Sequence, residues 1–486
     1  MATLQQAMDY HRRGKIPKAV KAYENVLANN NSADVKALLA LALADDGQPA
    51  RAAALIAEAV NADPNSALFR LQAAEVMLKV DDFPAAAVHL FWLEKNSPQQ
   101  PALRGLQARH YFGVGLRWHN QQREDLALPY YEKALAADAR ASEMWNNYGQ
   151  TLHALGRYDE ALAAYASSIK AAPDDASAHF HHAMQQMAMG DDAAGWKNYA
   201  WRFKAVTGLK YVREDMPVWQ GESLAGRRLL VADEQGFGDN IMMWRYLPLL
   251  RQQGAHIIYA ARPPLAPLLQ MAALADEVVL LEDIKRVVAD VQTLPMDWPA
   301  RCDTHGGNIP GTSGYLHGVH VPPHVVLPKG PRPRWGLVWR GNPKHAHDAR
   351  RSIPLGYFDQ LFTKNIDWFL LTRPADLPED EQTMYAPSEK KRPNMVMWGD
   401  KTQNFADLAA VLSQLDGLVT VDTATAHVAG AMGLKTFVLL PLGADWRWLT
   451  HRTDSPWYNS VRLFRQSHFA DWQTPLQHLA ETLGSD

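Results

Sequence analysis

The segment Leu415–Leu449 has the sequence LDGLVTVDTATAHVAGAMGLKTFVLLPLGADWRWL and predicts the fold of the second half of the chain. Its apolar run Leu418–Val421 is typical of a buried strand, and the small residues after Asp422 predict a helix that packs closely on a sheet and ends at Gly433. The next apolar run, Thr436–Leu440, predicts a second strand. A strand, a helix and a strand in this order form a βαβ unit, which indicates a parallel sheet.

Polar residues follow the first of these strands, at the place where a parallel sheet usually binds its ligand. Ligands lie beyond the carboxyl ends of the strands, and a helix that starts there points unpaired backbone N–H groups outward. We therefore expect Asp422, Thr423, Thr425 and His427 to line a ligand site. The alternative is that Asp422 or Thr423 only caps the helix and that His427 is a surface residue of its first turn.

Composition and charge are those of an ordinary globular protein. The sequence has 486 residues, 47% of them hydrophobic, which is enough for several domains with large cores. A formal net charge of −3 provides no basic field for nucleic acid and no polybasic surface for a membrane. Cys302 is the one cysteine, so neither an internal disulfide nor a cysteine zinc site is expected. The opening residues hold no apolar signal core, and we expect a cytoplasmic protein.

The first part of the chain repeats with a period of about 34 residues, the period of tetratricopeptide helix pairs. At this spacing a small alanine is followed, one helical turn later, by a larger side chain; the pairs are Ala19 and Tyr23, Ala52 and Ile56, Ala86 and Leu90, Ala127 and Tyr131, and Ala161 and Tyr165. We expect an all-α superhelix over residues 1–206. A degenerate last repeat around Trp196 is expected to cap the array and to dock it on the second half of the chain.

A repeat array of this kind presents a groove, because each helix pair buries its apolar face only against its neighbours. Such grooves usually hold peptides or proteins, so we expect a protein partner to bind here. The alternative is that the array serves only as a spacer or as a surface for self-association.

After residue 206 strands alternate with helices, which predicts an α/β fold. Apolar runs at 228–232, 256–260 and 277–281 predict the strands of a first lobe, residues 207–330. A proline-rich break at 321–333 separates it from a second lobe, residues 331–486, whose strands are predicted at 335–339, 368–371, 418–421 and 436–440. Two such lobes imply a cleft between them.

In the first lobe the segment EQGFGDN follows the first predicted strand and leads into a helix that starts near Asp239. Gly236 and Gly238 allow the backbone to approach a ligand closely. Asp239 would then point into the cleft, where its carboxylate can take a proton from an attacking hydroxyl. The alternative is that Asp239 is a plain helix cap, in which case Glu234 is the next candidate for the base.

In the second lobe a cationic cluster follows the first predicted strand. Lys344, Arg350 and Arg351 lie within the segment GNPKHAHDARRS, and Asn342 precedes them. Arginine and lysine are the usual residues that hold a diphosphate, so we expect this cluster to bind one. A solvated loop is the alternative. The histidines of this segment resemble a metal site only superficially, and no metal is predicted.

Taken together, the motifs EQGFGD, WRGNPKHAHDARRSIP, VDTATAHVAGAMG and GADWRW, in this order behind the repeats, resemble bacterial repeat-fused glycosyltransferases related to the ADP-heptose:lipopolysaccharide heptosyltransferases. The resemblance implies a GT-B fold of two Rossmann-like lobes and an inverting, metal-independent transfer of a hexosyl, heptosyl or related sugar. By this resemblance Asp239 stands in the place of the catalytic base. Asp422, Thr423 and His427 stand at the donor diphosphate, with Asn342, Lys344 and Arg351 as further donor contacts.

The resemblance and the repeats together predict an enzyme that moves a sugar from a nucleotide sugar to a protein recruited by the repeat groove. The nucleotide sugar is a co-substrate, and no bound cofactor is expected. Two alternatives remain open at this point. One is a non-catalytic GT-B scaffold or chaperone that binds a protein partner, and the other is a transferase that acts on a saccharide or lipid-linked acceptor.

Overall fold

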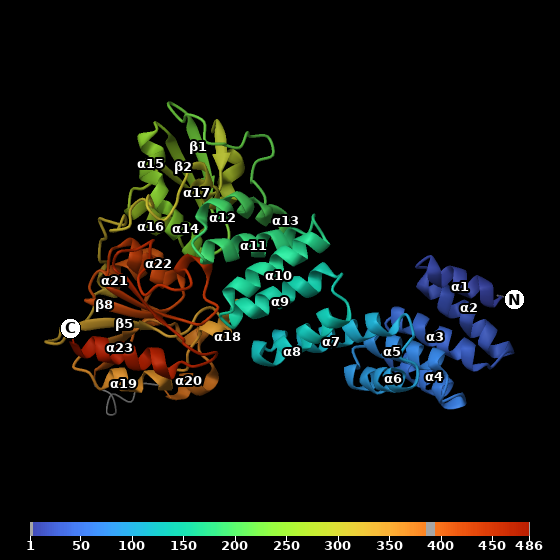
Figure 1. The fold of residues 1–486 in the computed structure, drawn as a ribbon. Helices are drawn as coiled ribbons and strands as arrows, with labels where there is room; N and C mark the ends of the chain where they lie inside the picture. The colour runs from blue at the N-terminus through green and yellow to red at the C-terminus, as the bar shows by residue number, and fades with distance from the viewer. Residues whose placement is uncertain (1–2, 385–393, 486) are drawn as a thin grey trace. The chain divides into compact units, whose positions relative to one another are not determined.

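The computed structural model of the protein describes residues 3–384 and 394–485. Contacts within it divide the chain into two units. The first unit comprises Met1–Thr151 and Ser167–Pro173, and the second comprises Leu152–Ala166 and Asp174–Asp486. In Figure 1 the first unit runs from blue to cyan, and the second runs from green to red.

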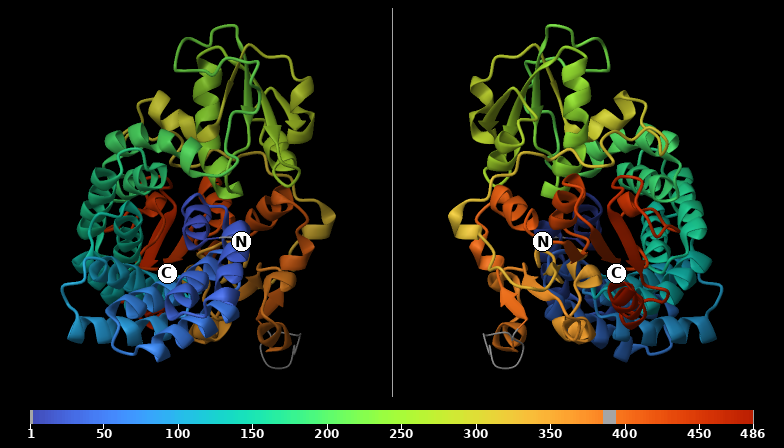
Figure 2. Two further views of the ribbon diagram at one scale, coloured as in Figure 1. Left: turned by 90° about the vertical axis from the view of Figure 1, so that its right-hand side faces the viewer. Right: turned by 90° about the vertical axis from the view of Figure 1, so that its left-hand side faces the viewer.

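The first unit is a series of antiparallel helix pairs, which Figure 2 shows from two further sides. The pairs are α1 (Leu4–Arg12) with α2 (Ile16–Asn29), α3 (Ala33–Asp45) with α4 (Pro49–Ala62), α5 (Ala67–Lys79) with α6 (Phe83–Asn96), and α7 (Leu103–Asn120) with α8 (Glu124–Ala137). The small residues that set the period, Ala19, Ala52, Ala86 and Ala127, are fully buried. The predicted helical repeat is therefore confirmed, because the alanines lie where paired helices touch.

The next helices are α9 (Ser142–Ala154), α10 (Tyr158–Ala171), α11 (Ala176–Ala188), α12 (Asp192–Asn198), η1 (Tyr199–Trp201) and α13 (Arg202–Ala205). From Leu152 onward most of these residues belong to the second unit. Trp196 packs edge-to-face on Trp446 of the α/β region with their rings 5.1 Å apart. The end of the helical array is thus part of the same compact body as the two lobes.

The first lobe contains a four-stranded parallel sheet. Its strands are β1 (Arg228–Ala232), β2 (His256–Ala261), β3 (Glu277–Leu280) and β4 (Val291–Thr293), in the order β3-β2-β1-β4. Ala232 pairs with Ala260, so the carboxyl ends of β1 and β2 lie next to each other. Helices α14 (Phe237–Met243), α15 (Leu247–Gln252) and α16 (Ala266–Met271) belong to this lobe.

The second lobe contains a six-stranded parallel sheet in the order β10-β9-β8-β5-β6-β7. Its strands are β5 (Arg334–Val338), β6 (Asp367–Leu370), β7 (Met395–Met397), β8 (Gly417–Val421), β9 (Thr436–Leu440) and β10 (Val461–Arg465). Val338 pairs with Thr420, so the segments that follow β5 and β8 start at the same edge of the sheet. The helices are α18 (Asp348–Arg351), α19 (Asp359–Phe362), α20 (Glu379–Met384), α21 (Phe405–Leu412), α22 (Ala424–Ala431) and α23 (Gln473–Ser485).

The βαβ unit predicted at Leu415–Leu449 is confirmed as β8, α22 and β9, and Gly433 ends the helix with a φ of 73°. The fold class is confirmed as well, since a helical repeat array precedes two lobes that each contain a parallel sheet. Three strands, β4, β7 and β10, were not predicted. Among the described residues no helix is long and apolar enough to cross a membrane.

The two lobes are in direct contact beside the candidate site. Helices α14 and α22 pack together, and a Cβ atom placed on Gly238 would lie 2.6 Å from Cδ2 of His427. The backbone N–H of Tyr315 donates to the carbonyl oxygen of Ala431 at 2.7 Å. Gly238 is therefore needed for close packing between the lobes, and the close approach to a ligand expected from the sequence stays a prediction.

Candidate functional site

A cavity of about 810 Å³ lies in the second unit, where loops from both sheets converge. Its walls come from the segments that follow β1, β2, β5, β6, β7, β8 and β9, and from helix α11. Open parallel sheets bind their ligands at this end of the strands. Most of the residues predicted for the site line the cavity: Gly236, Gly238, Asp239, Asn342, Arg351, Asp422, Thr423, Thr425 and His427.

The start of helix α22 opens into this cavity. Thr423 occupies the N-cap position with extended backbone angles, and its side chain makes no capping hydrogen bond within the described structure. Its hydroxyl lies 3.3 Å from the hydroxyl of Thr420 instead. The first N–H groups of α22 thus receive no capping bond from the Thr423 side chain, which suits them to bind an anion.

Arg351 is the cation that lies beside this helix start. Its Nη1 donates to the carbonyl oxygen of Asp422 at 2.9 Å, and its Nε donates to Asp348 at 3.1 Å. A Cβ atom on Gly341 would come within 2.7 Å of the guanidinium, so glycine is needed there. The side chain is 18% exposed and lines the cavity. The contacts with Asp422 and Asp348 therefore fix the Arg351 side chain, and part of its guanidinium stays accessible to a ligand.

The other cations of the cluster lie elsewhere. Lys344 is exposed and is not among the residues that line the cavity. Its backbone N–H donates to Oδ1 of Asn342 at 3.0 Å, which forms a tight turn. Arg350 lies near His153 and Tyr165 of the helical array, where burial lowers the pKa of His153 and the charge of Arg350 lowers it further. Of the three cations, the structure brings Arg351 to the cavity. Among the described residues no group of three or more histidine, cysteine, aspartate or glutamate side chains is placed to hold a metal ion.

Asp239 lies at the junction of the two lobes and is 17% exposed. Helix α14 begins at Phe237, so Asp239 is its third residue, and its Oδ2 accepts the backbone N–H of Gly236 at 2.7 Å. Its Oδ1 accepts a hydrogen bond from Nη2 of Arg447, which comes from the second lobe. Burial raises the pKa of Asp239 and the charge of Arg447 opposes that rise. Asp239 is thus a helix cap and a cavity-lining carboxylate at once.

Arg447 was missed as a site residue, although its motif GADWRW was noted. Its Nη1 also donates to Oδ1 of Asp445 at 2.6 Å, and its guanidinium carbon lies 4.3 Å from the ring of Trp446. Burial alone would raise the pKa of Asp445, but Arg447 outweighs that effect and the pKa is lowered. Burial and the charge of Asp445 raise the pKa of Asp422. The cavity therefore holds a set of coupled charges.

His427 is buried rather than exposed on the first turn of α22. Its Nδ1 lies 2.9 Å from the hydroxyl of Tyr458, and its ring stacks on Trp448 with a centroid distance of 5.4 Å and an interplanar angle of 19°. Burial lowers the pKa of His427 to about 3, and the charge of Arg447 acts in the same direction. His427 is therefore neutral at physiological pH, and Gly238 packs against one edge of its ring.

Further arginines line the cavity but are paired. Arg262 donates to Asp233 and to the carbonyl oxygen of Gln235, at 3.3 and 2.9 Å. Arg340 forms a two-point contact with the buried Glu381 at 2.6 and 2.8 Å. The sequence did not single out these residues, because their partners are separated from them by long stretches of chain.

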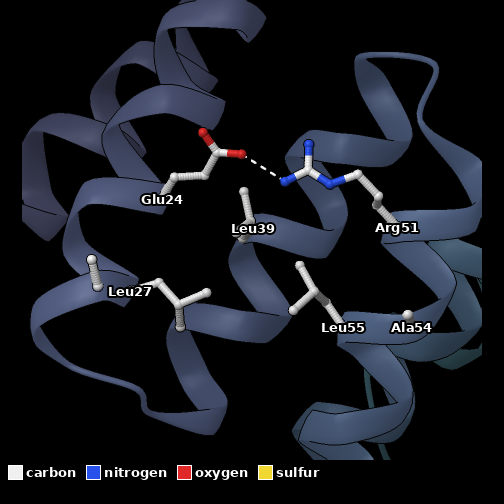
Figure 3. A pocket seen from close by; sticks show the side chains of 7 residues that line it. Glu24, Leu27, Leu39, Arg51, Ala54 and Leu55 are labelled. Atoms are coloured by element: carbon white, nitrogen blue, oxygen red, sulfur yellow. Dashed lines mark hydrogen bonds and ion pairs between the residues drawn. The ribbon is translucent and has the colours of Figure 1, made fainter.

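A second cavity, of about 420 Å³, lies in the first unit between the first two helix pairs. Its wall is apolar at Leu27, Leu39 and Leu55, and Glu24 and Arg51 form an ion pair of 2.6 Å at one side (Figure 3). An apolar centre with a polar rim is the general arrangement of a protein–protein interface.

Comparison with known proteins identifies the helical repeats. The sequence model of the Tetratricopeptide repeat family matches residues 4–67 and 120–176. Protein FlbA of Caulobacter vibrioides is 24% identical, with 74% of this chain and 70% of that protein covered. The N-terminal part is therefore a tetratricopeptide repeat array.

Two solved structures give partial matches to this chain. A glycosyl transferase family 9 protein from Veillonella parvula matches 55% of this chain and 99% of its own, with 13% identity and a TM-score of 0.41. PilF of Pseudomonas aeruginosa matches 42% of this chain and 91% of its own, with 17% identity and a TM-score of 0.35. Both scores are low, so the fold described above rests on the helices and sheets themselves.

Proposed function

We propose that this protein is an inverting glycosyltransferase that moves a sugar from a nucleotide sugar to a protein acceptor. The observation that carries the proposal is the cavity between the two parallel-sheet lobes, which has a carboxylate on one wall and a helix start with an arginine on another. A carboxylate that takes a proton and a cationic anion site are the two parts that metal-independent sugar transfer needs.

The donor diphosphate is assigned to the start of α22 and to Arg351. Asp422, Thr423 and His427 frame this place, and Asn342 lies on the loop beside it. The partial positive charge of the helix start and the fixed guanidinium of Arg351 stabilise the charge that develops on the leaving diphosphate. Lys344 remains the second candidate for this contact, on a loop that a bound donor would have to draw inward. No resident cofactor is proposed, and no metal is needed for catalysis.

Asp239 is assigned the role of base. Its carboxylate takes the proton of the acceptor hydroxyl, the acceptor oxygen forms a bond to the anomeric carbon, and the bond from that carbon to the diphosphate oxygen breaks with its electron pair on the diphosphate. Attack from the side opposite to the leaving group inverts the anomeric centre. This chemistry needs no covalent enzyme intermediate.

A protein acceptor is supported by the helical array. Phe180 and Met184 of α11, one turn apart on the same helix, line the cavity that also contains Asp239. The cavity in the first unit provides a separate apolar surface for a peptide segment. A protein acceptor bound by the repeats is therefore the best candidate. A saccharide or lipid-linked acceptor would not account for these two surfaces.

A thermal-shift screen tests the proposal. Ligands that bind only the folded state raise the midpoint of unfolding, so nucleoside diphosphates and their sugars are screened against the wild type and the Arg351→Ala variant. We expect at least one nucleotide sugar to raise the midpoint of the wild type, and to raise it less in the variant. If none does so while protein partners still bind, the second candidate, a non-catalytic scaffold, replaces the enzyme.

A further inference from the structure

We infer that Arg447 is the positioning residue that orients the Asp239 carboxylate for proton transfer and favours its ionised form, through a contact that joins the two lobes. The inference rests on the proposed role of Asp239. It assigns a function to a side chain that belongs to neither the donor site nor the cationic loop.

Both oxygens of the Asp239 carboxylate are held, and Arg447 holds one of them. Oδ2 is fixed by the N–H of Gly236 within the first lobe, and Oδ1 is fixed by Nη2 of Arg447 from the second lobe. Each oxygen keeps a lone pair for an incoming proton. The orientation of the carboxylate is thus set by one contact from each lobe.

Arg447 itself is firmly held. It is 9% exposed, it shares its charge between Asp239 and Asp445, and its guanidinium lies over the ring of Trp446. Both sequence neighbours of Arg447 are packed as well. The ring of Trp446 lies against Trp196 of the helical array, and the ring of Trp448 stacks on His427. Arg447 is therefore carried by a segment whose aromatic side chains fix it on both sides.

Two residues with strained backbones flank the ion pair in sequence. Gln235 precedes α14 with a φ of 51°, and Leu449 follows the segment of Arg447 with a φ of 55°. Non-glycine residues in the left-handed region persist only where the surrounding structure holds them, and they cluster at functional sites.

The charges around Asp239 decide what the loss of Arg447 would do. Arg447 and Arg262 favour the ionised form of Asp239, and Asp445 opposes it. The charge of Asp239 in turn acts to raise the pKa of His345 and of Tyr199. Arg447 is the strongest of the charges that favour ionisation. Without it, burial and Asp445 would raise the pKa of Asp239 further.

The experiment compares the wild type with Arg447→Met and Arg447→Lys. Release of nucleoside diphosphate from ADP-, GDP- and UDP-linked sugars is measured against pH, and binding of ADP, GDP and UDP is measured by calorimetry. We expect Arg447→Met to lower kcat about 10²-fold and to move the acid limb of the pH profile to higher pH. Arg447→Lys should recover part of both, and affinity for the nucleotides should change less than about threefold.

Other outcomes overturn the inference. If nucleotide binding weakens tenfold or more while the acid limb stays in place, Arg447 is a phosphate contact. If turnover falls with no shift in the pH profile and no rescue by lysine, its role is only structural.

A readout without turnover separates failure of this inference from failure of the proposed function. Thermal unfolding is measured between pH 5 and 8 for the Arg447→Met variant and for the double variant Asp239→Asn with Arg447→Met. We expect the single variant to lose stability at pH 8 and to regain it as the pH falls and Asp239 takes up a proton, and the double variant to show a weaker dependence on pH. Identical pH dependences would refute the link between Arg447 and Asp239, even if no sugar nucleotide is turned over.

Discussion

Replacing Gly238 by alanine tests the contact between the lobes directly. The added Cβ would lie 2.6 Å from Cδ2 of His427 and 3.6 Å from Cα of Ala424. The histidine ring cannot turn away easily, because it stacks on Trp448 and lies 2.9 Å from the hydroxyl of Tyr458. Overpacking of this kind costs about 1–3 kcal/mol. Alanine is favoured over glycine inside a helix by up to about 1 kcal/mol, so we expect a net loss of about 1–2 kcal/mol.

The assay is urea unfolding of Gly238→Ala, with a double-mutant cycle that includes His427→Ala. Removing the ring should make the alanine at position 238 neutral or stabilising, so the two changes should show a coupling of about 1–3 kcal/mol. Gly356→Ala is the matched control, because a Cβ atom there meets nothing within 4 Å. A Gly238→Ala variant as stable as the wild type, with no coupling to His427, would refute the close packing of the lobes at this point.

Three further predictions concern binding, pH and the repeats. Arg351→Ala should weaken nucleoside diphosphate binding by about 1.5–3 kcal/mol in calorimetry, with or without EDTA. An equal loss in Lys344→Ala alone would move the phosphate contact to that residue. A loss of binding on chelation would contradict metal independence. Burial lowers the pKa of His427 from 6.5 to about 3, so the stability that its neutral form contributes is present above pH 6.5 and is lost as the pH falls. In urea unfolding, the wild type should lose about 2 kcal/mol more stability than His427→Gln between pH 7 and pH 5. Equal losses would show that His427 is not buried in its neutral form. A protein that begins at Ser66 and lacks α1–α4 should keep nucleotide binding and lose capture of its acceptor; the reverse result would make the repeats a structural support.

The strands that could be predicted from the sequence are those with continuous apolar runs, such as Leu418–Val421 and Thr436–Leu440. Buried strands of a parallel sheet leave this signal because both of their faces are covered. Strand β10, Val461–Arg465, was missed because arginines interrupt its pattern, and β4 and β7 were missed because each spans only three residues. Each strand that was not predicted pairs with a predicted one, β4 with β1, β7 with β6 and β10 with β9. The two parallel sheets could therefore be predicted without them.

The candidate site was predictable where its residues follow a strand and start a helix, as Asp239 and Asp422 do. Contacts between residues that lie far apart in the sequence could not be predicted. Arg447 lies 208 residues from Asp239, and nothing in the local sequence indicates that the two share a charge. The same limit applies to His427, for which exposure on the first turn was the alternative, because Trp448 and Tyr458 from later loops bury it.

The central claim, that Asp239 is the base of a sugar transfer in this cavity, is tested most directly by the turnover of Asp239→Asn. Asparagine keeps the size of the side chain and its oxygen for the N–H of Gly236, but it cannot take up the proton. Sugar transfer from a nucleotide sugar is measured together with nucleotide affinity in the wild type and the variant. We predict that kcat falls about 10²–10⁴-fold while nucleotide affinity changes little. Near-normal turnover in the variant would contradict the claim and leave Asp239 as a helix cap that joins the two lobes.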